Sequence, residues 1–216
     1  MEDKVLITKI NREEALRYMG ASEMKLDDQM IKLLDECEAA LLKSMKPDYV
    51  YRVFDKKSLS LPGKSINDHL KGCDRCVFLC ATLSSAVDRL IKTAGIANMS
   101  KALMIDAMAS AAVEEVCNQA EHQIKKALPD AYLTWRFGVG YGDFPLDYQP
   151  EFLRLVSAAK TIGVTASGSL MLNPIKSVTC IIGLSDKPLD HKKKSCEDCN
   201  LAGKCQFRKR GTRCGV

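Results

Sequence analysis

The sequence has no long hydrophobic run, no recognisable acid–base pair and only three histidines. No apolar stretch reaches the roughly 18 residues that a membrane-spanning helix needs, so we expect no membrane span. The first residues lack the basic-then-apolar order of a signal peptide, and we therefore expect a cytoplasmic protein. The histidines (His69, His122 and His191) are scattered, and we expect surface positions for them rather than catalytic roles. Internal repeats are also absent.

What remains is the composition of an ordinary globular protein. The chain has 216 residues, 46% of them hydrophobic and 27% charged, which is enough to bury one sizeable core. Residues 187–216 carry nine Lys/Arg against three Asp/Glu, whereas the preceding 186 residues are close to neutral. We therefore expect a domain over residues 1–185 and a basic, cysteine-rich tail over 186–216. Such a tail binds nucleic acid or an acidic protein face, or is simply a solvated surface segment.

Helix caps and apolar patterns predict a mixture of helices and strands. Helices are expected at residues 11–19, 27–46, 65–70, 84–94, 100–128 and 150–161. Strands are expected at residues 49–54, 76–82, 132–137, 164–172 and 177–184. The order lacks a regular βαβ rhythm, which favours an α+β fold with a mostly antiparallel sheet.

The most informative segment runs from Arg136 to Leu146, with the sequence RFGVGYGDFPL. Arginine offers a planar fork of donors to a carboxylate or phosphate, and glycines allow a ligand to approach the backbone closely. Tyr141 can lay its ring against a flat group and still donate a hydrogen bond. The segment is typical of one wall of a small-molecule site. The alternatives are an ordinary turn, a structural salt bridge for Arg136 and core packing for Tyr141.

Glu114 is the unusual residue on the expected long helix. It falls near a stripe formed by Leu103, Ala107, Ser110 and Cys117, which should face the core. Removing an unpaired carboxylate from water costs several kcal/mol, so Glu114 must meet a cation. That cation is either the ammonium group of a ligand or a structural Arg or Lys. Glu115 lies off the stripe, and we expect it to be solvated.

Arg136-x-x-x-Gly140-Tyr141 is followed by three further matching stretches, which are Ile162-Gly163-Val164-Thr165, Ser169-x-x-x-x-Pro174 and Ser177-Val178. Together they resemble the reactivation domain of cobalamin-dependent methionine synthase, and in particular its short, free-standing homologues. The resemblance covers about residues 60 to 185 and implies a twisted, mostly antiparallel sheet flanked by helices. Two features depart from the family pattern. Gly168 replaces an acidic residue, and the tail follows Leu184 where a further strand is usual.

In that family the Arg-x-x-x-Gly-Tyr segment binds S-adenosylmethionine. The resemblance implies that Arg136 pairs with the carboxylate of the ligand and Glu114 with its ammonium group. Gly140, Gly142 and Asp143 would present backbone groups, and Tyr141 would border the adenosine or the sulfonium. Because of the two departures, part of the adenosine pocket is expected to be missing or rebuilt.

The resemblance also implies the reaction and the partners. In the family, the sulfonium methyl goes to the cobalt of cob(II)alamin after a one-electron reduction, and the cobalamin is held by a separate module. Our leading hypothesis is therefore an accessory component of methionine biosynthesis rather than a complete enzyme. It would serve the cobalamin-binding module of a methionine synthase or another corrinoid protein. The electron donor would be a protein such as flavodoxin or ferredoxin, and we expect no membrane partner.

The tail contains Cys196, Cys199, Cys205 and Cys214 within nineteen residues. Four clustered thiols suit a tetrahedral zinc site or an iron–sulfur cluster, and free thiols are the alternative. A second group is Cys73, Cys76 and Cys80. We expect Cys76 and Cys80 to pack as small apolar groups, while Cys73 with Cys76 is a candidate redox pair.

Two rival hypotheses come from other classes of protein. In the first, the tail carries an iron–sulfur cluster for electron transfer, and the rest of the chain is a docking surface for a corrinoid protein. In the second, the tail is a basic zinc ribbon that binds nucleic acid, in which case its affinity would depend strongly on salt. Under our leading hypothesis we expect no nucleic-acid partner.

Overall fold

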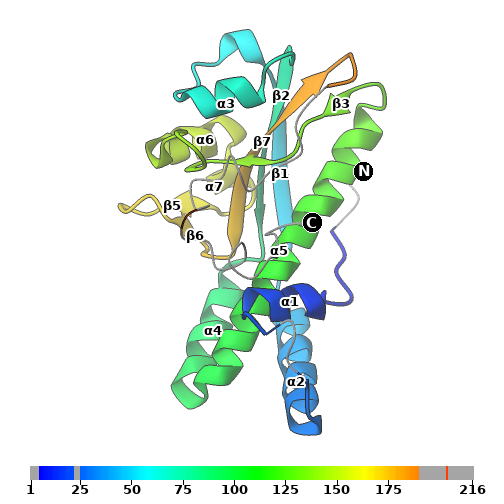
Figure 1. The fold of residues 1–216 in the computed structure, drawn as a ribbon. Coiled ribbons are helices and arrows are strands. Elements are labelled where there is room, and N and C mark those ends of the chain that lie inside the picture. The colour runs from blue at the N-terminus through cyan, green and yellow to red at the C-terminus, as the bar shows by residue number, and fades with distance from the viewer. Residues whose placement is uncertain (1–4, 22–24, 190–202, 204–216) are drawn as a thin grey trace. The chain divides into compact units, whose positions relative to one another are not determined.

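The computed structural model describes residues 5–21, 25–189 and 203, and it has an α+β fold (Figure 1). Two compact units are built from interleaved segments of the chain. Unit 1 comprises residues 1–52, 79–129 and 149–179, and unit 2 comprises 53–78, 130–148 and 180–216. The mostly antiparallel sheet with flanking helices confirms the predicted fold class.

The sheet has the strand order β1-β2-β7-β3, and β4 also pairs with β7. Its strands are β1 (Asp48–Asp55), β2 (Arg75–Thr82), β3 (Tyr132–Leu133), β4 (Phe137–Gly138) and β7 (Ser177–Ser185). Strands β2 and β7 are buried along most of their length, which explains their nearly continuous apolar runs. Strands β1, β2 and β7 each contribute residues to both units.

In unit 1, the first two helices begin where the sequence predicts. Asn11 accepts a hydrogen bond from the Glu14 N–H and caps α1 (Arg12–Tyr18). Asp27 accepts from the Met30 N–H and caps α2 (Asp28–Ser44). These side chains satisfy amide groups that a helix terminus leaves without partners.

Helices α4 (Ser85–Ala97) and α5 (Met99–Ala127) pack against each other and against α2 (Figure 1). The cap of α5 is Asn98, which accepts from the Lys101 N–H, rather than the predicted Ser100. Many of the buried residues of α5 are alanines, which lets neighbouring helices approach closely. Leu103 is 54% exposed, so its predicted place on the buried stripe is wrong.

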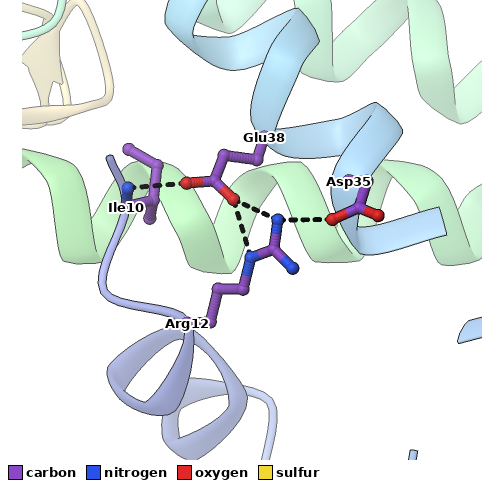
Figure 2. Close-up of polar contacts among 4 residues, drawn as sticks. All are labelled: Ile10, Arg12, Asp35 and Glu38. Atoms are coloured by element: carbon purple, nitrogen blue, oxygen red, sulfur yellow. Dashed lines mark hydrogen bonds and ion pairs between the residues drawn. The ribbon is translucent and has the colours of Figure 1, made fainter. Parts of the chain in front are cut away.

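The segment before α1 is held on α2 and α5 by two side chains. Gln119 of α5 accepts from the Leu6 N–H at 3.2 Å and donates to the Leu6 carbonyl at 2.9 Å. Glu38 of α2 is buried, and its Oε1 accepts from the Ile10 N–H at 2.8 Å (Figure 2). Arg12 donates to Glu38 Oε2 from Nε at 2.6 Å, and its Nη2 reaches Asp35 at 2.7 Å. This network pairs the buried Glu38 charge with an arginine.

The rest of unit 1 differs from two predictions. The helix expected from Pro150 to Thr161 is divided into α6 (Gln149–Val156) and α7 (Ala158–Thr161), because Ser157 adopts a left-handed conformation with φ 58°. The strand expected from Val164 to Leu172 is wrong. A hairpin of β5 (Thr165–Ala166) and β6 (Leu172–Asn173) takes its place, with a turn closed by the Leu170 N–H and the Ser167 carbonyl.

In unit 2, the segment between β1 and β2 contains a short 3-10 helix, η1 (Lys56–Ser58), and α3 (Lys64–His69). Helix α3 begins after Gly63, so the prediction that Ser65 caps it is wrong. A second 3-10 helix, η2 (Leu146–Tyr148), follows the glycine-containing segment. Among the helices that the structure describes, none has the length and apolarity needed to cross a membrane.

Candidate functional site

Arg136 lies at an irregularity between β3 and β4. Thr134 is opposite Gly183 on β7, since the Thr134 N–H donates to the Gly183 carbonyl at 3.0 Å. Phe137 is opposite Ile181. Trp135 and Arg136 therefore face the single residue Ile182, which is the pattern of a β-bulge. A bulge turns side chains away from their regular alternation, so the half-buried Arg136 is aimed by this local distortion.

A tight turn follows the bulge. The Gly140 N–H donates to the Phe144 carbonyl, the Phe144 N–H donates to the Tyr141 carbonyl, and the Tyr141 N–H donates to the Gly138 carbonyl. Gly140 has φ +84°, a conformation that residues with a side chain rarely adopt. The glycine spacing noted in the sequence is thus required by the turn itself.

The turn is attached to the first residues of α3. The carboxylate of Asp143 accepts from the Lys64 N–H and the Ser65 N–H, each at 2.8 Å. These bonds, with that from Ser65 first in importance, lower the pKa of Asp143 below its ordinary value. The carbonyl of Asp143 lies so close to Gly63 that a Cβ there would be 2.7 Å away. The side chain of Asp143 therefore caps α3 from a distant part of the chain, which the sequence did not reveal.

Aromatic rings line this part of unit 2. Tyr141 meets Trp135 and Phe137 edge-on, with ring centroids 6.1 and 5.5 Å apart. Phe137 also approaches Phe144, and Phe144 approaches Tyr148 at 5.1 Å. Tyr141 is half-buried, so its ring both packs against its neighbours and stays partly accessible.

His69 belongs to the same group, although the sequence suggested a surface position. It is 7% exposed, so that prediction is wrong. Its ring lies 4.4 Å from Trp135 and 5.0 Å from Phe137, and its Nε2 is 2.8 Å from the hydroxyl of Thr134. The last residue of a six-residue helix carries no sequence signal of this burial. His122 is not buried, in keeping with the prediction, and His191 lies outside the described residues.

Glu114 belongs to unit 1, where it is half-buried on α5 near α1. Burial, together with the negative charges of Glu14 and Glu114, raises the pKa of Tyr18 to about 12. The guanidinium of Arg17 lies 4.8 Å above the Tyr18 ring. The surroundings of Glu114 thus include the phenol of Tyr18 on α1.

Closer to the start of α5, Asp106 and Ser110 bind the side chain of Lys176, a contact that the sequence did not reveal. Lys176, just before β7, has a side chain that is 11% exposed. Its Nζ lies 2.9 Å from Asp106 and donates to the Ser110 hydroxyl at 3.0 Å. Lys176 therefore joins the segment before β7 to α5 through an ion pair and a hydrogen bond.

The predicted cysteine sites separate into two cases. Cys73, Cys76 and Cys80 are buried free thiols, and burial raises the pKa of both Cys76 and Cys80 to about 12. The packing expected for Cys76 and Cys80 is confirmed. Cys196, Cys199, Cys205 and Cys214 lie outside the described residues. Within the described part, no group of three or more His, Cys, Asp or Glu side chains is arranged to hold a metal ion.

No protein-family model matches this sequence, and no curated protein matches it either. A solved structure does match, and it is described as "Crystal Structure of the MetH Reactivation Domain bound to AdoHcy". The superposition has a TM-score of 0.59 and covers 96% of this chain and 78% of the solved chain. The chain has the fold of the MetH reactivation domain. Sequence identity is 15%, so the likeness concerns the fold alone.

Proposed function

We propose that this protein binds S-adenosylmethionine and supports the reductive methylation of cob(II)alamin held by a partner protein. The observation that carries the proposal is the match in fold to the reactivation domain. The match covers 96% of this chain, and the solved structure is described as bound to AdoHcy. The Arg-x-x-x-Gly-Tyr segment adds support, since Arg136 lies at a β-bulge and bulges are frequent next to functional sites.

The residues of unit 2 fit one part of such a ligand. Arg136 offers a planar fork of donors, which suits the carboxylate of an amino-acid moiety. Tyr141 keeps part of its ring accessible for an adenosine or a sulfonium group. Gly140, Gly142 and Asp143 would contribute backbone groups only. The carboxylate of Asp143 is already engaged by α3, and Gly142 lies against Ser65.

Glu114 is proposed to pair with the ammonium group of the ligand. Glu114 is half-buried on α5, and a carboxylate that is partly removed from water favours a cationic partner. The structural alternative is a cation of α1, the helix that carries Tyr18 and Arg17. Glu114→Gln distinguishes the two alternatives. It should lower ligand affinity if Glu114 pairs with the ammonium group of the ligand, and it should lower protein stability if Glu114 pairs with a cation of α1.

The bound ligand would supply the methyl group, and the corrinoid of the partner would accept it together with an electron from a donor such as flavodoxin or ferredoxin. The residues of this chain then need only bind, orient and exclude water. The partner is proposed to be the cobalamin-binding module of a methionine synthase or of a related corrinoid methyltransferase. The protein would act in the cytoplasm as an accessory component of that enzyme.

We extend the proposal to the organisation of the chain. Residues 1–185 would form the reactivation-like domain, and residues 186–216 a basic appendage that binds zinc or an iron–sulfur cluster through its four cysteines. Elemental analysis and the absorbance of anaerobically purified protein near ~400 nm test this part, because clusters absorb there and zinc does not. Substituting Cys196 and Cys199 by serine should abolish the metal content.

Calorimetric titration with S-adenosylmethionine tests the binding claim. The wild type should bind, Arg136→Ala should bind about ten- to a hundredfold more weakly, and Arg136→Lys should fall between them. Arg154→Ala is the matched control, because Arg154 forms an exposed pair with Glu151 and should leave the affinity unchanged. If the wild type shows no binding heat and no thermal stabilisation at millimolar ligand, the proposal is refuted.

A further inference from the structure

His69 is a buried imidazole that has no role in the proposed binding of the ligand. It is 7% exposed and belongs to α3, whereas Arg136 follows β3. Both residues lie in unit 2. The hydroxyl of Thr134 connects them, because it contacts His69 on one side and the backbone next to Arg136 on the other.

The hydrogen bonds of Thr134 can all be satisfied in one arrangement. A hydroxyl has one proton to donate and two lone pairs that accept. Its oxygen accepts from the Gly183 N–H at 2.8 Å and donates to the Trp135 carbonyl at 3.2 Å. The remaining lone pair then accepts from Nε2 of His69 at 2.8 Å. In this arrangement, His69 carries its proton on Nε2.

This arrangement acts directly on the bulge. The Trp135 carbonyl belongs to the peptide group that leads into Arg136, so the Thr134 hydroxyl orients that peptide group. The His69 ring packs against Trp135 and Phe137, which are the two neighbours of Arg136 in sequence. The backbone on both sides of the guanidinium is thereby held from α3.

We infer that His69, acting through Thr134, is a positioning residue that aims Arg136 and so makes the site selective for ligands with a carboxylate. The identity of the ligand rests on the proposed function, whereas the positioning of the bulge does not. A purely structural His69 would affect all ligands and the stability of unit 2 alike. A positioning His69 affects the carboxylate end of the ligand in particular.

The test compares S-adenosylmethionine with 5′-methylthioadenosine, which has the same nucleoside but no amino-acid moiety. His69→Leu should weaken binding of S-adenosylmethionine about ten- to a hundredfold, because one charge-assisted contact is lost. The affinity for 5′-methylthioadenosine should change by no more than about twofold. His69→Gln retains an N–H donor and should recover most of the affinity. In an Arg136→Ala background, His69→Leu should have no further effect.

Phe54→Leu is the matched control, because Phe54 is an aromatic residue of the same unit that packs on Phe78. It should leave both affinities unchanged. An equal loss for both ligands on His69→Leu, or an undiminished loss in the Arg136→Ala background, would overturn the inference. If His69→Leu does not fold, Thr134→Val, which removes the connecting hydroxyl, takes its place against Thr134→Ser.

A second measurement needs no ligand. Trp135 is the only tryptophan of the chain, so its fluorescence reports on the bulge alone. The emission maximum should shift in His69→Leu and return toward the wild-type position in His69→Gln. Identical spectra for all three proteins would overturn the positioning of the bulge. Failure of the wild type to bind either ligand, with the predicted spectral changes present, would refute the proposed function only.

Discussion

Gly142 lies against Ser65 so closely that a Cβ at residue 142 would be 2.7 Å from the Ser65 hydroxyl and 2.8 Å from the Ser65 Cβ. Gly142 also has φ +59°. In a sequence, a glycine next to an arginine and a tyrosine suggests room for a ligand. Here the missing side chain makes room for α3, and the glycine-containing turn is built onto that helix.

Gly142→Ala should therefore destabilise the protein by about 1–3 kcal/mol, through steric conflict added to backbone strain. Urea denaturation measures the change. Two other glycines separate the causes. Gly163 has φ +69° with nothing near its Cβ position, so alanine there should cost only about 1 kcal/mol. Gly168 has neither constraint, and alanine there should change stability by no more than about 0.5 kcal/mol. A similar cost at residues 142 and 168 would contradict the packing described.

Asp143 should make the free energy of unfolding depend on pH in the acid range. The N–H groups of Ser65 and Lys64 lower its pKa in the folded protein, so its contribution is present above the unfolded-state pKa of about 4. The contribution is lost as the pH falls through the lower, folded-state value. Asp143→Asn should be less stable than the wild type at pH 7, and the difference should narrow below about pH 4. Chemical denaturation at several pH values tests this, and a pH-independent difference would exclude the carboxylate as its source.

The Arg12–Glu38 pair should be far more important than an exposed pair of the same chemistry. Glu38 has a side chain that is 9% exposed, so Arg12→Met leaves a buried charge without its guanidinium and should cost about 2–4 kcal/mol. Arg154 and Glu151 also form two hydrogen bonds, but both are exposed, and Arg154→Met should cost less than about 0.5 kcal/mol. Thermal denaturation of the two variants compares them. Equal costs would mean that burial of Glu38 has no energetic consequence.

Cys76 and Cys80 should resist alkylation in the native protein. Burial raises the pKa of both thiols to about 12, and the thiolate is the reactive form. Iodoacetamide at pH 8 followed by peptide mass analysis should find both unmodified, and both should react after denaturation. Rapid native labelling would show that this part of β2 opens readily.

Local signals in the sequence were sufficient for much of the fold. Asn11 and Asp27 are polar residues directly before amphipathic patterns, and the apolar runs of β2 and β7 are too short for buried helices. The segment from Val164 to Leu172 was mistaken for one strand. It contains residues of high strand propensity at both ends, and its Ser-Gly-Ser centre forms the turn of a hairpin.

Features that depend on distant residues could not be predicted in this way. The cap of α3 is Asp143, which is 78 residues from Ser65 in sequence. The burial of His69 depends on Thr134 and two aromatic rings of another segment. The bulge at Arg136 appears only when its strand is aligned with β7. The roles of Glu114, Arg136 and Tyr141 toward a ligand, and of the tail cysteines toward a metal, remain predictions.

Gln119 imitates a peptide group, since its single amide satisfies both the N–H and the carbonyl of Leu6. Deamidation of this side chain to a carboxylate would keep the acceptor and replace the donor by a second oxygen, which would repel the Leu6 carbonyl. The amino-terminal segment would then detach from α5 at that point. One slow hydrolysis, characteristic of ageing protein, would thereby loosen the chain around Leu6, whereas the Glu38 carboxylate would still hold the Ile10 N–H.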